Sequence, residues 1–322
     1  ESADEQQRYM FYLQQKSFGS DSTDLLPALN NFAEWNMFAF SAPPANSYYA
    51  NPLKDGSNLN PTVIRSLDEA NFRVERLIHA QNIYWSIIQI LLDNFGMQDP
   101  RLLDFEKRLA LTNYYFATTV ATELDTMSLT VAEPSHTTST PQFPAPSISN
   151  MGYRHGREAL ERRRNYMLEM PAVPVIEQAK AGLDLADWML LFNRQRVKSL
   201  EMYQTLHDEL NPNNNNQEIT DIFSPALPIL LPSFIYPFNS RATLGIPPEQ
   251  ALVYQGYIDV EFKLNRFGKT SDINVLSAST DPNDNLQQML VRILQRSIYR
   301  PRFASGKILT EDLVQARYYY AY

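Results

Sequence analysis

The hydrophobic pattern of the chain changes once, close to residue 250. Before about residue 210, apolar residues recur at steps of three and four with polar residues between them, which is the pattern of amphipathic helices. Between Gly256 and Leu264 apolar and polar residues alternate, which is typical of a strand with one side facing solvent. The pattern therefore predicts an α+β multidomain chain, with an all-α first part and a small β-α domain at the end.

Six segments of the first part carry the helical period. They lie near residues 24–41, 68–95, 101–125, 156–169, 175–192 and 196–210. The clearest break between them is the stretch 133–150, which contains four prolines among threonines and serines. Because proline interrupts helices, this stretch is predicted to be a loop or linker rather than a helix.

The first part also contains an internal repeat. Three residue pairs recur at a single offset of 77 positions: Phe18-Gly19, Leu25-Leu26 and Phe32-Ala33 match Phe95-Gly96, Leu102-Leu103 and Leu109-Ala110. A weaker third copy places Leu185-Ala186-Asp187-Trp188 opposite Phe32-Ala33-Glu34-Trp35. A fixed offset of this kind indicates a stacked helical array, and the glycine after each phenylalanine predicts a helix C-cap.

The third copy resembles a tetratricopeptide repeat. The residues that carry the resemblance are the small Ala186, a turn near Asn193, the small Ser199, the aromatic Tyr203 four residues later, and a closing Pro212. The resemblance implies an N-terminal solenoid of degenerate tetratricopeptide-like repeats over residues 1–210. In such a solenoid the groove binds a protein partner.

Residues 211–248 differ in composition from both neighbours. A run of four asparagines is followed by six prolines with apolar residues interleaved. Two interpretations are open: an extended segment that lies along a domain surface, and a free tether between domains. The apolar residues favour the first, because a solvated tether has no use for them.

Residues 249–322 predict a small β-β-α-β domain. The expected elements are a strand over 256–264, a hairpin turn at 265–268, a strand over 273–278, a helix that begins near Asp284 and runs to about Ser297, and a final strand over 313–320. These motifs are similar to the C-terminal domain of TonB-type energy transducers. The residues that carry this resemblance are Tyr236-Pro237, Gly256-Tyr257-Ile258-Asp259-Val260-Glu261-Phe262, Gly268, Ile273-Asn274-Val275, Arg300-Pro301-Arg302-Phe303 and Gly306.

The resemblance covers about residues 236–322 and implies a mode of action. Domains of that family lie in the periplasm and bind an extended receptor peptide by adding it as a strand to the sheet edge. By this resemblance, the open edge would be the last strand, near residues 314–319. The chain has neither the membrane helix nor the long Pro-rich spacer of a working transducer, so we expect an adaptor rather than an energy transducer.

Two groups of residues are candidates for partner binding. The tail places several aromatic residues on both faces of the last strand, where core packing and an interface are both open interpretations. Arginines also cluster after residue 290, as a solvated helix face, or as a patch for an acidic partner or for the chain's own acidic repeats. The candidate partner-binding residues are Val314, Arg317, Tyr318, Tyr319, Tyr320, Arg296, Arg300 and Arg302.

Composition excludes several classes of function. The 322 residues include 28 Lys and Arg against 36 Asp and Glu, a net charge of −8 that argues against nucleic-acid binding. The chain has no cysteine, and its apolar runs fall short of a membrane span. No phosphate-binding loop, nucleophile elbow or paired-histidine zinc motif occurs, so we expect no enzyme, no cofactor and no metal.

The expected function is that of a non-catalytic protein-binding adaptor or scaffold of the bacterial cell envelope. The absence of cysteine and a chain that begins with Glu1 favour a periplasmic or otherwise exported protein with its signal peptide removed, although trimming of the chain would also explain that start. Two alternatives are a self-assembling structural subunit and an accessory component of TonB-dependent uptake.

Overall fold

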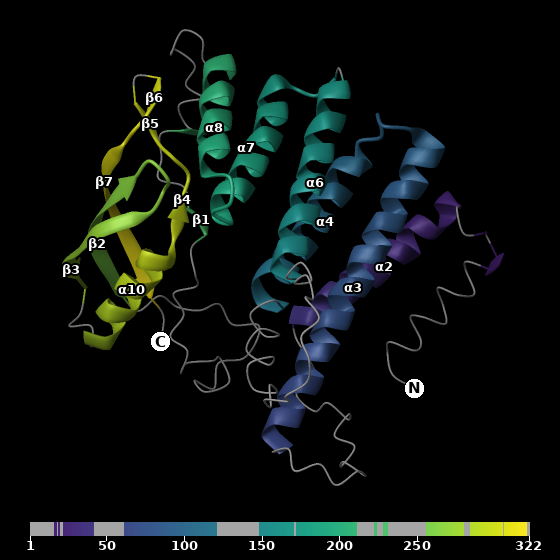
Figure 1. Ribbon diagram of the computed structural model, residues 1–322, viewed down its shortest axis with the longest axis horizontal. Helices are drawn as coiled ribbons and strands as arrows, with labels where there is room; N and C mark the ends of the chain where they lie inside the picture. Colours follow the sequence, from purple (N-terminus) through teal and green to yellow (C-terminus); the bar gives the residue numbers. More distant parts are fainter. Residues whose placement is uncertain are drawn as a thin grey trace, which may run out of the picture. The chain divides into compact units, whose positions relative to one another are not determined.

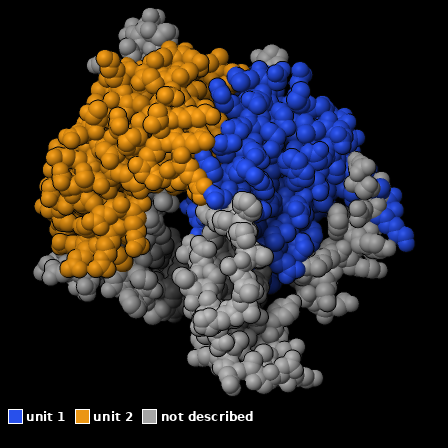
Figure 2. Space-filling model, viewed as in Figure 1, with its two compact units in different colours: residues 1–174 blue, residues 175–322 orange. Residues whose placement is uncertain are grey.

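The chain forms two compact units, residues 1–174 and residues 175–322 (Figure 2). The computed structural model describes residues 16–17, 19, 22–41, 61–120, 148–170, 172–210, 222–223, 228–230, 256–279, 284–304 and 306–320 (Figure 1). Helices occupy the first part and antiparallel strands lie near the C-terminus, so the predicted α+β class is confirmed.

The first unit is a series of helices, each of which packs on the next. Its described elements are η1 (Thr23–Leu25), α2 (Leu26–Ser41), α3 (Pro61–Phe95), α4 (Arg101–Tyr115), the π-helical turn η2 (Phe116–Val120) and α6 (Ile148–Glu169). Helix α2 packs on α3, α3 on α4, and α4 on α6 (Figure 1).

Two of these helices are longer than the sequence predicts. Helix α3 begins at Pro61 rather than near residue 68, and proline suits a first helical position because its missing N–H has no acceptor there. Helix α6 begins at Ile148, so the last three residues of the predicted linker 133–150 are helical. That part of the loop prediction is wrong, because the last proline of the stretch is Pro146 and nothing after it interrupts a helix. The rest of that linker, with His136, lies outside the described residues.

The internal repeat has a structural counterpart in the first unit. Leu25 and Leu102, which are 77 positions apart, are both fully buried at the start of a helix. Gly19 and Gly96 both have positive φ, of 90° and 75°, and the Gly96 amide donates to the carbonyl of Leu92 at the end of α3. The predicted glycine C-cap is therefore present at Gly96.

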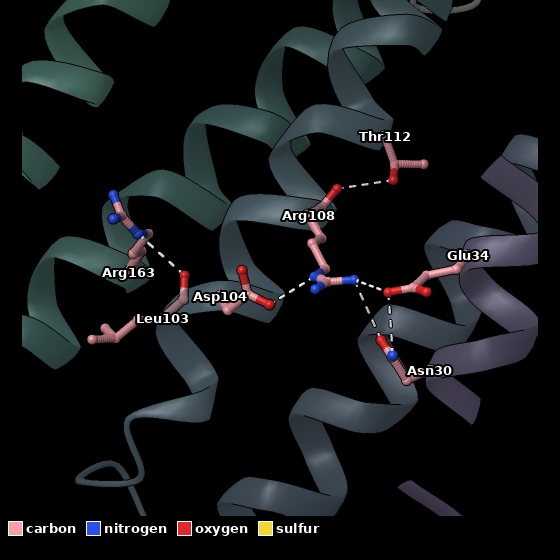
Figure 3. Close-up of polar contacts among 7 residues, drawn as sticks. All are labelled: Asn30, Glu34, Leu103, Asp104, Arg108, Thr112 and Arg163. Atoms are coloured by element: carbon pink, nitrogen blue, oxygen red, sulfur yellow. Dashed lines mark hydrogen bonds and ion pairs between the residues drawn. The ribbon is translucent and has the colours of Figure 1, made fainter. Parts of the chain in front are cut away.

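Arg108 is the centre of a polar network that joins α2 to α4 (Figure 3). Its Nε donates to Asp104 at 2.7 Å, one turn earlier on α4, and its Nη1 donates to Glu34 on α2 at 2.5 Å. Asn30 on α2 donates to the same Glu34 carboxylate. Because two carboxylates surround one guanidinium, this network fixes the facing sides of the two helices.

The second unit combines a helix pair with a small β-α layer. Its described elements are α7 (Val175–Leu191), α8 (Arg196–Leu210), β1 (Pro228–Leu230), β2 (Gly256–Asn265), β3 (Thr270–Ala278), α10 (Asp284–Arg296), β4 (Ile298–Tyr299), β5 (Phe303–Ala304), β6 (Lys307–Ile308) and β7 (Glu311–Tyr320). The main sheet has the order β3-β2-β7 with antiparallel neighbours, and β1 pairs with β4 and β5 with β6.

Helices α7 and α8 form a tight antiparallel pair (Figure 1). The turn between them contains Asn193 with a positive φ of 58°. Small residues allow close approach: the Ser199 hydroxyl on α8 donates to the carbonyl of Ala186 on α7 at 2.8 Å. A Cβ on Gly182 would lie 2.9 Å from Leu206. The pair belongs to the same compact unit as the sheet, whereas the sequence placed it with the preceding helices of residues 1–210.

The strand β4 separates two hydrophobic cores within the second unit. Tyr299 belongs to the core between α10 and the inner face of the sheet, with Val260, Phe262 and Leu290. Ile298, the neighbouring residue, belongs to the core beneath α7 and α8. Because successive strand residues point to opposite sides, this dipeptide contributes one side chain to each core.

The described residues of the segment 211–248 pack on the second unit. Phe223 is buried against His207 and Phe303, with ring centroids 5.4 Å and 4.9 Å away. The three residues of β1 pair with β4. At these positions the segment lies along a domain surface, the first of the two interpretations; the rest of 211–248 lies outside the described residues.

The hairpin between β2 and β3 depends on Gly268. Its φ is +67°, and a Cβ there would lie 1.8 Å from the carbonyl oxygen of Tyr299. We expect Gly268→Ala to lower the free energy of unfolding of the second unit by at least about 2 kcal/mol, because left-handed strain and a backbone clash add. Urea denaturation followed by circular dichroism measures this.

Gly96→Ala is the matched control. Gly96 has a similar φ of +75°, but no atom lies within 4 Å of a Cβ built there. Gly96→Ala should therefore lower the free energy of unfolding only by the left-handed backbone strain, about 1 kcal/mol. Equal losses in the two variants would show that the contact with Tyr299 is unimportant.

Candidate functional site

The strand β7 lies at an edge of the main sheet, and its pairing is unusually regular. It pairs with β2 over ten consecutive residues, from Gly256 opposite Tyr320 to Asn265 opposite Glu311, without a shift of register. In the part of the chain that the structure describes, no strand pairs with the other side of β7. The predicted edge strand is therefore at an edge in the structure.

The pairing identifies which backbone groups of β7 point away from the sheet. Asn265 donates to Lys269, and Tyr257 accepts from Ser279, so both residues turn their backbone groups toward β3 or the residues that border it. The even-numbered residues of β2 therefore direct their backbone N–H and C=O groups toward β7. Their partners on β7 are even-numbered too, so the N–H and C=O groups of Leu313 and Gln315 point away from β2, toward the edge of the sheet.

The side chains of β7 alternate between the core and the outer face. Val314, Ala316 and Tyr318 pack in the core with α10. The Tyr318 hydroxyl lies 2.7 Å from that of Tyr299, and burial raises the pKa of both phenols. Tyr319 and Tyr320 belong to β7, but their side chains lie outside the described part of the structure. Val314 and Tyr318 thus fill the core, the first of the two interpretations of the aromatic tail.

The outer face of the sheet carries cross-strand polar pairs. Arg317 donates to both oxygens of Asp259, at 2.7 Å and 3.0 Å, and its guanidinium lies 3.8 Å from the centre of the Tyr257 ring. The bonds from Arg317 and from the Ser277 hydroxyl lower the pKa of Asp259. Gln315 donates to Glu261 at 2.9 Å. This face is therefore polar and ordered, with Leu313 as an exposed apolar residue at the rim.

The opposite edge, strand β3, is irregular. Its register with β2 shifts twice, and each shift places an extra residue in β3. Leu276 lies at one of these bulges, and Asp272, with a φ of +49°, lies at the other. Because bulges interrupt the row of edge donors and acceptors, β3 is a poor template for an added strand, and β7 is the better one.

The arginines of the predicted cluster have different surroundings in the structure. Arg300 donates to both carboxylate oxygens of Asp187 on α7, at 3.1 Å and 2.5 Å. Arg302 pairs with Asp312 at the start of β7. Arg296 ends α10 and is exposed. Arg300 and Arg302, like Arg317 with Asp259, therefore already have acidic partners inside the unit, whereas Arg296 is exposed.

Asp187 holds a second buried group. The Tyr203 hydroxyl on α8 donates to the Asp187 oxygen that also accepts from Arg300. Burial and the neighbouring Asp187 raise the pKa of Tyr203 far above its usual range. No local sequence pattern identifies this triad, because Asp187 and Arg300 are 113 positions apart. The ion pair fits the interpretation in which the arginines contact the chain's own acidic repeats.

Other candidate chemistry is sparse in the described residues. His207 is buried and stacks on Phe303, with ring centroids 4.5 Å apart, and His79 contacts Glu75 on the surface of α3. His155 lines a cleft among α3, α4 and α6. Among the described residues there is no group of three side chains that could hold a metal ion. Within the same residues, no helix has the length and apolar character needed to cross a membrane.

The Arg300 pair predicts a large difference between two neighbouring arginines. Arg300→Met should lower the free energy of unfolding by about 2–4 kcal/mol, because it leaves Asp187 largely buried without its cation. Arg296→Met, the matched control at an exposed position, should change it by less than about 0.5 kcal/mol. Urea denaturation of both variants measures the difference, and similar losses would contradict a structural role for the pair.

Comparison with known proteins finds no significant match for this chain. No family model matches the chain, and neither a curated protein nor a solved structure is significantly similar to it. The geometry of the two units is therefore the basis for a functional assignment.

Proposed function

We propose that the chain is a non-catalytic protein-binding adaptor or scaffold of the bacterial cell envelope, and that it captures an extended segment of a partner by strand addition to β7. The observation that carries the proposal is the regular ten-residue pairing of β7 at a sheet edge. In strand addition, backbone hydrogen bonds supply affinity and alternate side chains supply selectivity.

Three further features support this proposal. The outward backbone groups at Leu313 and Gln315 lie on the regularly paired strand, whereas bulges interrupt the other edge. The outer face beside them is polar and ordered, with the exposed Leu313 available for an apolar contact. The resemblances to TonB C-terminal domains and to tetratricopeptide repeats are consistent with protein binding, and with the absence of cysteine they favour an exported location.

The helices of the first unit are the second part of the proposal. Helices α2, α3, α4 and α6 pack as a successive series, which is how helical arrays expose an extended surface for a partner. In this proposal the stacked helices hold one protein and the β7 edge holds another.

A proline substitution at Gln315 tests strand addition. The N–H of Gln315 points away from β2, so Gln315→Pro removes an edge donor and leaves the pairing with β2 intact. Peptides selected from a displayed random library on the immobilised wild-type chain serve as the probe. We expect Gln315→Pro to weaken their binding at least tenfold, measured by isothermal titration calorimetry.

Gln315→Ala is the matched control, because it removes the same side chain and the same bond to Glu261 but keeps the backbone N–H. Its affinity should stay within about threefold of the wild type, since an exposed side-chain hydrogen bond contributes little. Circular dichroism confirms that both variants fold. Undiminished binding to Gln315→Pro would overturn the proposal.

The same edge favours a second candidate, a self-assembling structural subunit. An exposed, regular edge strand with an apolar residue such as Leu313 also pairs with copies of itself. Size-exclusion chromatography with light scattering separates the two. Concentration-dependent oligomers that disappear in Gln315→Pro would favour self-assembly over an adaptor, whereas a chain that stays monomeric favours the adaptor.

A further inference from the structure

A cleft with both polar and apolar walls lies among α3, α4 and α6 in the first unit. Its volume is about 380 Å³, near the lower end of the range for small-molecule pockets, roughly 300–1,000 Å³. Its side chains come from one face of each helix, at spacings of three or four residues: Gln81 and Trp85, Leu109 and Asn113, and Glu158 and Arg162. Because none of these residues belongs to the second unit, the cleft is independent of the β7 edge.

A pair of side-chain amides fixes one wall of the cleft. Gln81 donates its amide to the side-chain oxygen of Asn113 at 3.0 Å, and Asn113 donates to the carbonyl of Leu109 at 2.8 Å. Asn113 is buried, so this arrangement is held in place. Gln81 and the exposed Asn82 both line the cleft, and a side-chain amide carries an acceptor oxygen as well as two donors.

An ion pair fixes another wall. Arg162 donates from Nε and Nη2 to the two oxygens of Glu106, at 2.7 Å and 2.9 Å, and Glu106 is fully buried. The same guanidinium lies 4.9 Å from the centre of the Trp85 ring. A guanidinium has five N–H groups, so Arg162 keeps donors beyond the two that Glu106 accepts. The wall is preorganised, which lowers the entropic cost of binding.

The formal charges around the cleft cancel. Glu106 pairs with Arg162, and Glu158 lies 3.8 Å from Arg154 one turn earlier on α6. His155 lies between Arg154 and Glu158 in sequence, and its Nε2 is 3.3 Å from the Arg154 guanidinium. A site with balanced charge gives no advantage to an ionic ligand over a neutral one.

We propose that this cleft binds a neutral saccharide of one or two rings. Trp85 has 44% of its surface exposed, and the part of its ring that Arg162 does not cover offers an apolar wall. The amides of Gln81 and Asn82, the carboxylate of Glu158 and the guanidinium of Arg162 offer both acceptors and donors around it. A saccharide combines an apolar C–H face with hydroxyls that donate and accept, so it satisfies both kinds of wall at once.

The test uses the full chain and ligand-observed NMR with a panel of probes. The neutral probes are glucose, galactose, mannose, N-acetylglucosamine and their β1,4-linked disaccharides, and the charged probes are choline and inorganic phosphate. We expect saturable binding of at least one neutral saccharide. Trp85→Ala should weaken saccharide binding at least tenfold. Glu158→Gln should weaken it about three- to tenfold, because a carboxylate only accepts hydrogen bonds, whereas the amide has one accepting oxygen and one donating NH2 group.

Leu111→Ala is the matched control, because Leu111 is a large exposed apolar residue on α4 that does not line the cleft. It should leave the affinity unchanged. Glu158 is half-exposed, so Glu158→Gln remains informative even if Trp85→Ala fails to fold. The proposal is overturned if no neutral saccharide shows saturable binding, if choline or phosphate binds more tightly than every saccharide, or if both cleft variants bind as the wild type does.

Discussion

The interaction on which the second unit depends is the contact of one carboxylate with two distant groups. Asp187 on α7 accepts from Tyr203 on the adjacent helix and from Arg300, which follows β4. All three side chains are largely buried, and a buried charge is stable only with its partner in place. This requirement holds the helix pair against the strand segment, together with the apolar core that α7 and α8 share with Ile298 and Phe303 in the same compact unit.

The ion pairs of Arg300 and Arg302 also bear on which side chains cover the inner face of the sheet and which groups remain at its edge. With Arg300 held by Asp187, Ile298 and Tyr299 each enter a different core, and Tyr299 closes the inner face together with α10. Arg302 is held against Asp312, at the start of β7. Arg300 and Arg302, two of the arginines that the sequence offered for an acidic partner, thus stabilise the unit, whereas the backbone groups of Leu313 and Gln315 on β7 point away from β2.

The two proposed sites use different physical principles. The β7 edge offers backbone donors and acceptors in a regular row, which tolerates many sequences in a partner strand. The cleft of the first unit offers fixed side chains of balanced charge, which select a ligand by the positions of its polar groups. Because the sites belong to separate units, variants at one leave the other intact and their failures are distinguishable.

The sequence by itself determined the local structure. Hydrophobic period placed β2, α10 and β7 within a few residues, and the glycine after Phe95 predicted the cap of α3, because these features depend on neighbouring residues alone. The extent of α6 was underestimated at its start. Only the tertiary structure decided that Asp187 would meet Arg300, that β3 would bulge while β7 stayed regular, and that three helix faces would enclose a cleft. Each of these depends on side chains far apart in the chain, and no local pattern encodes which distant residues come into contact.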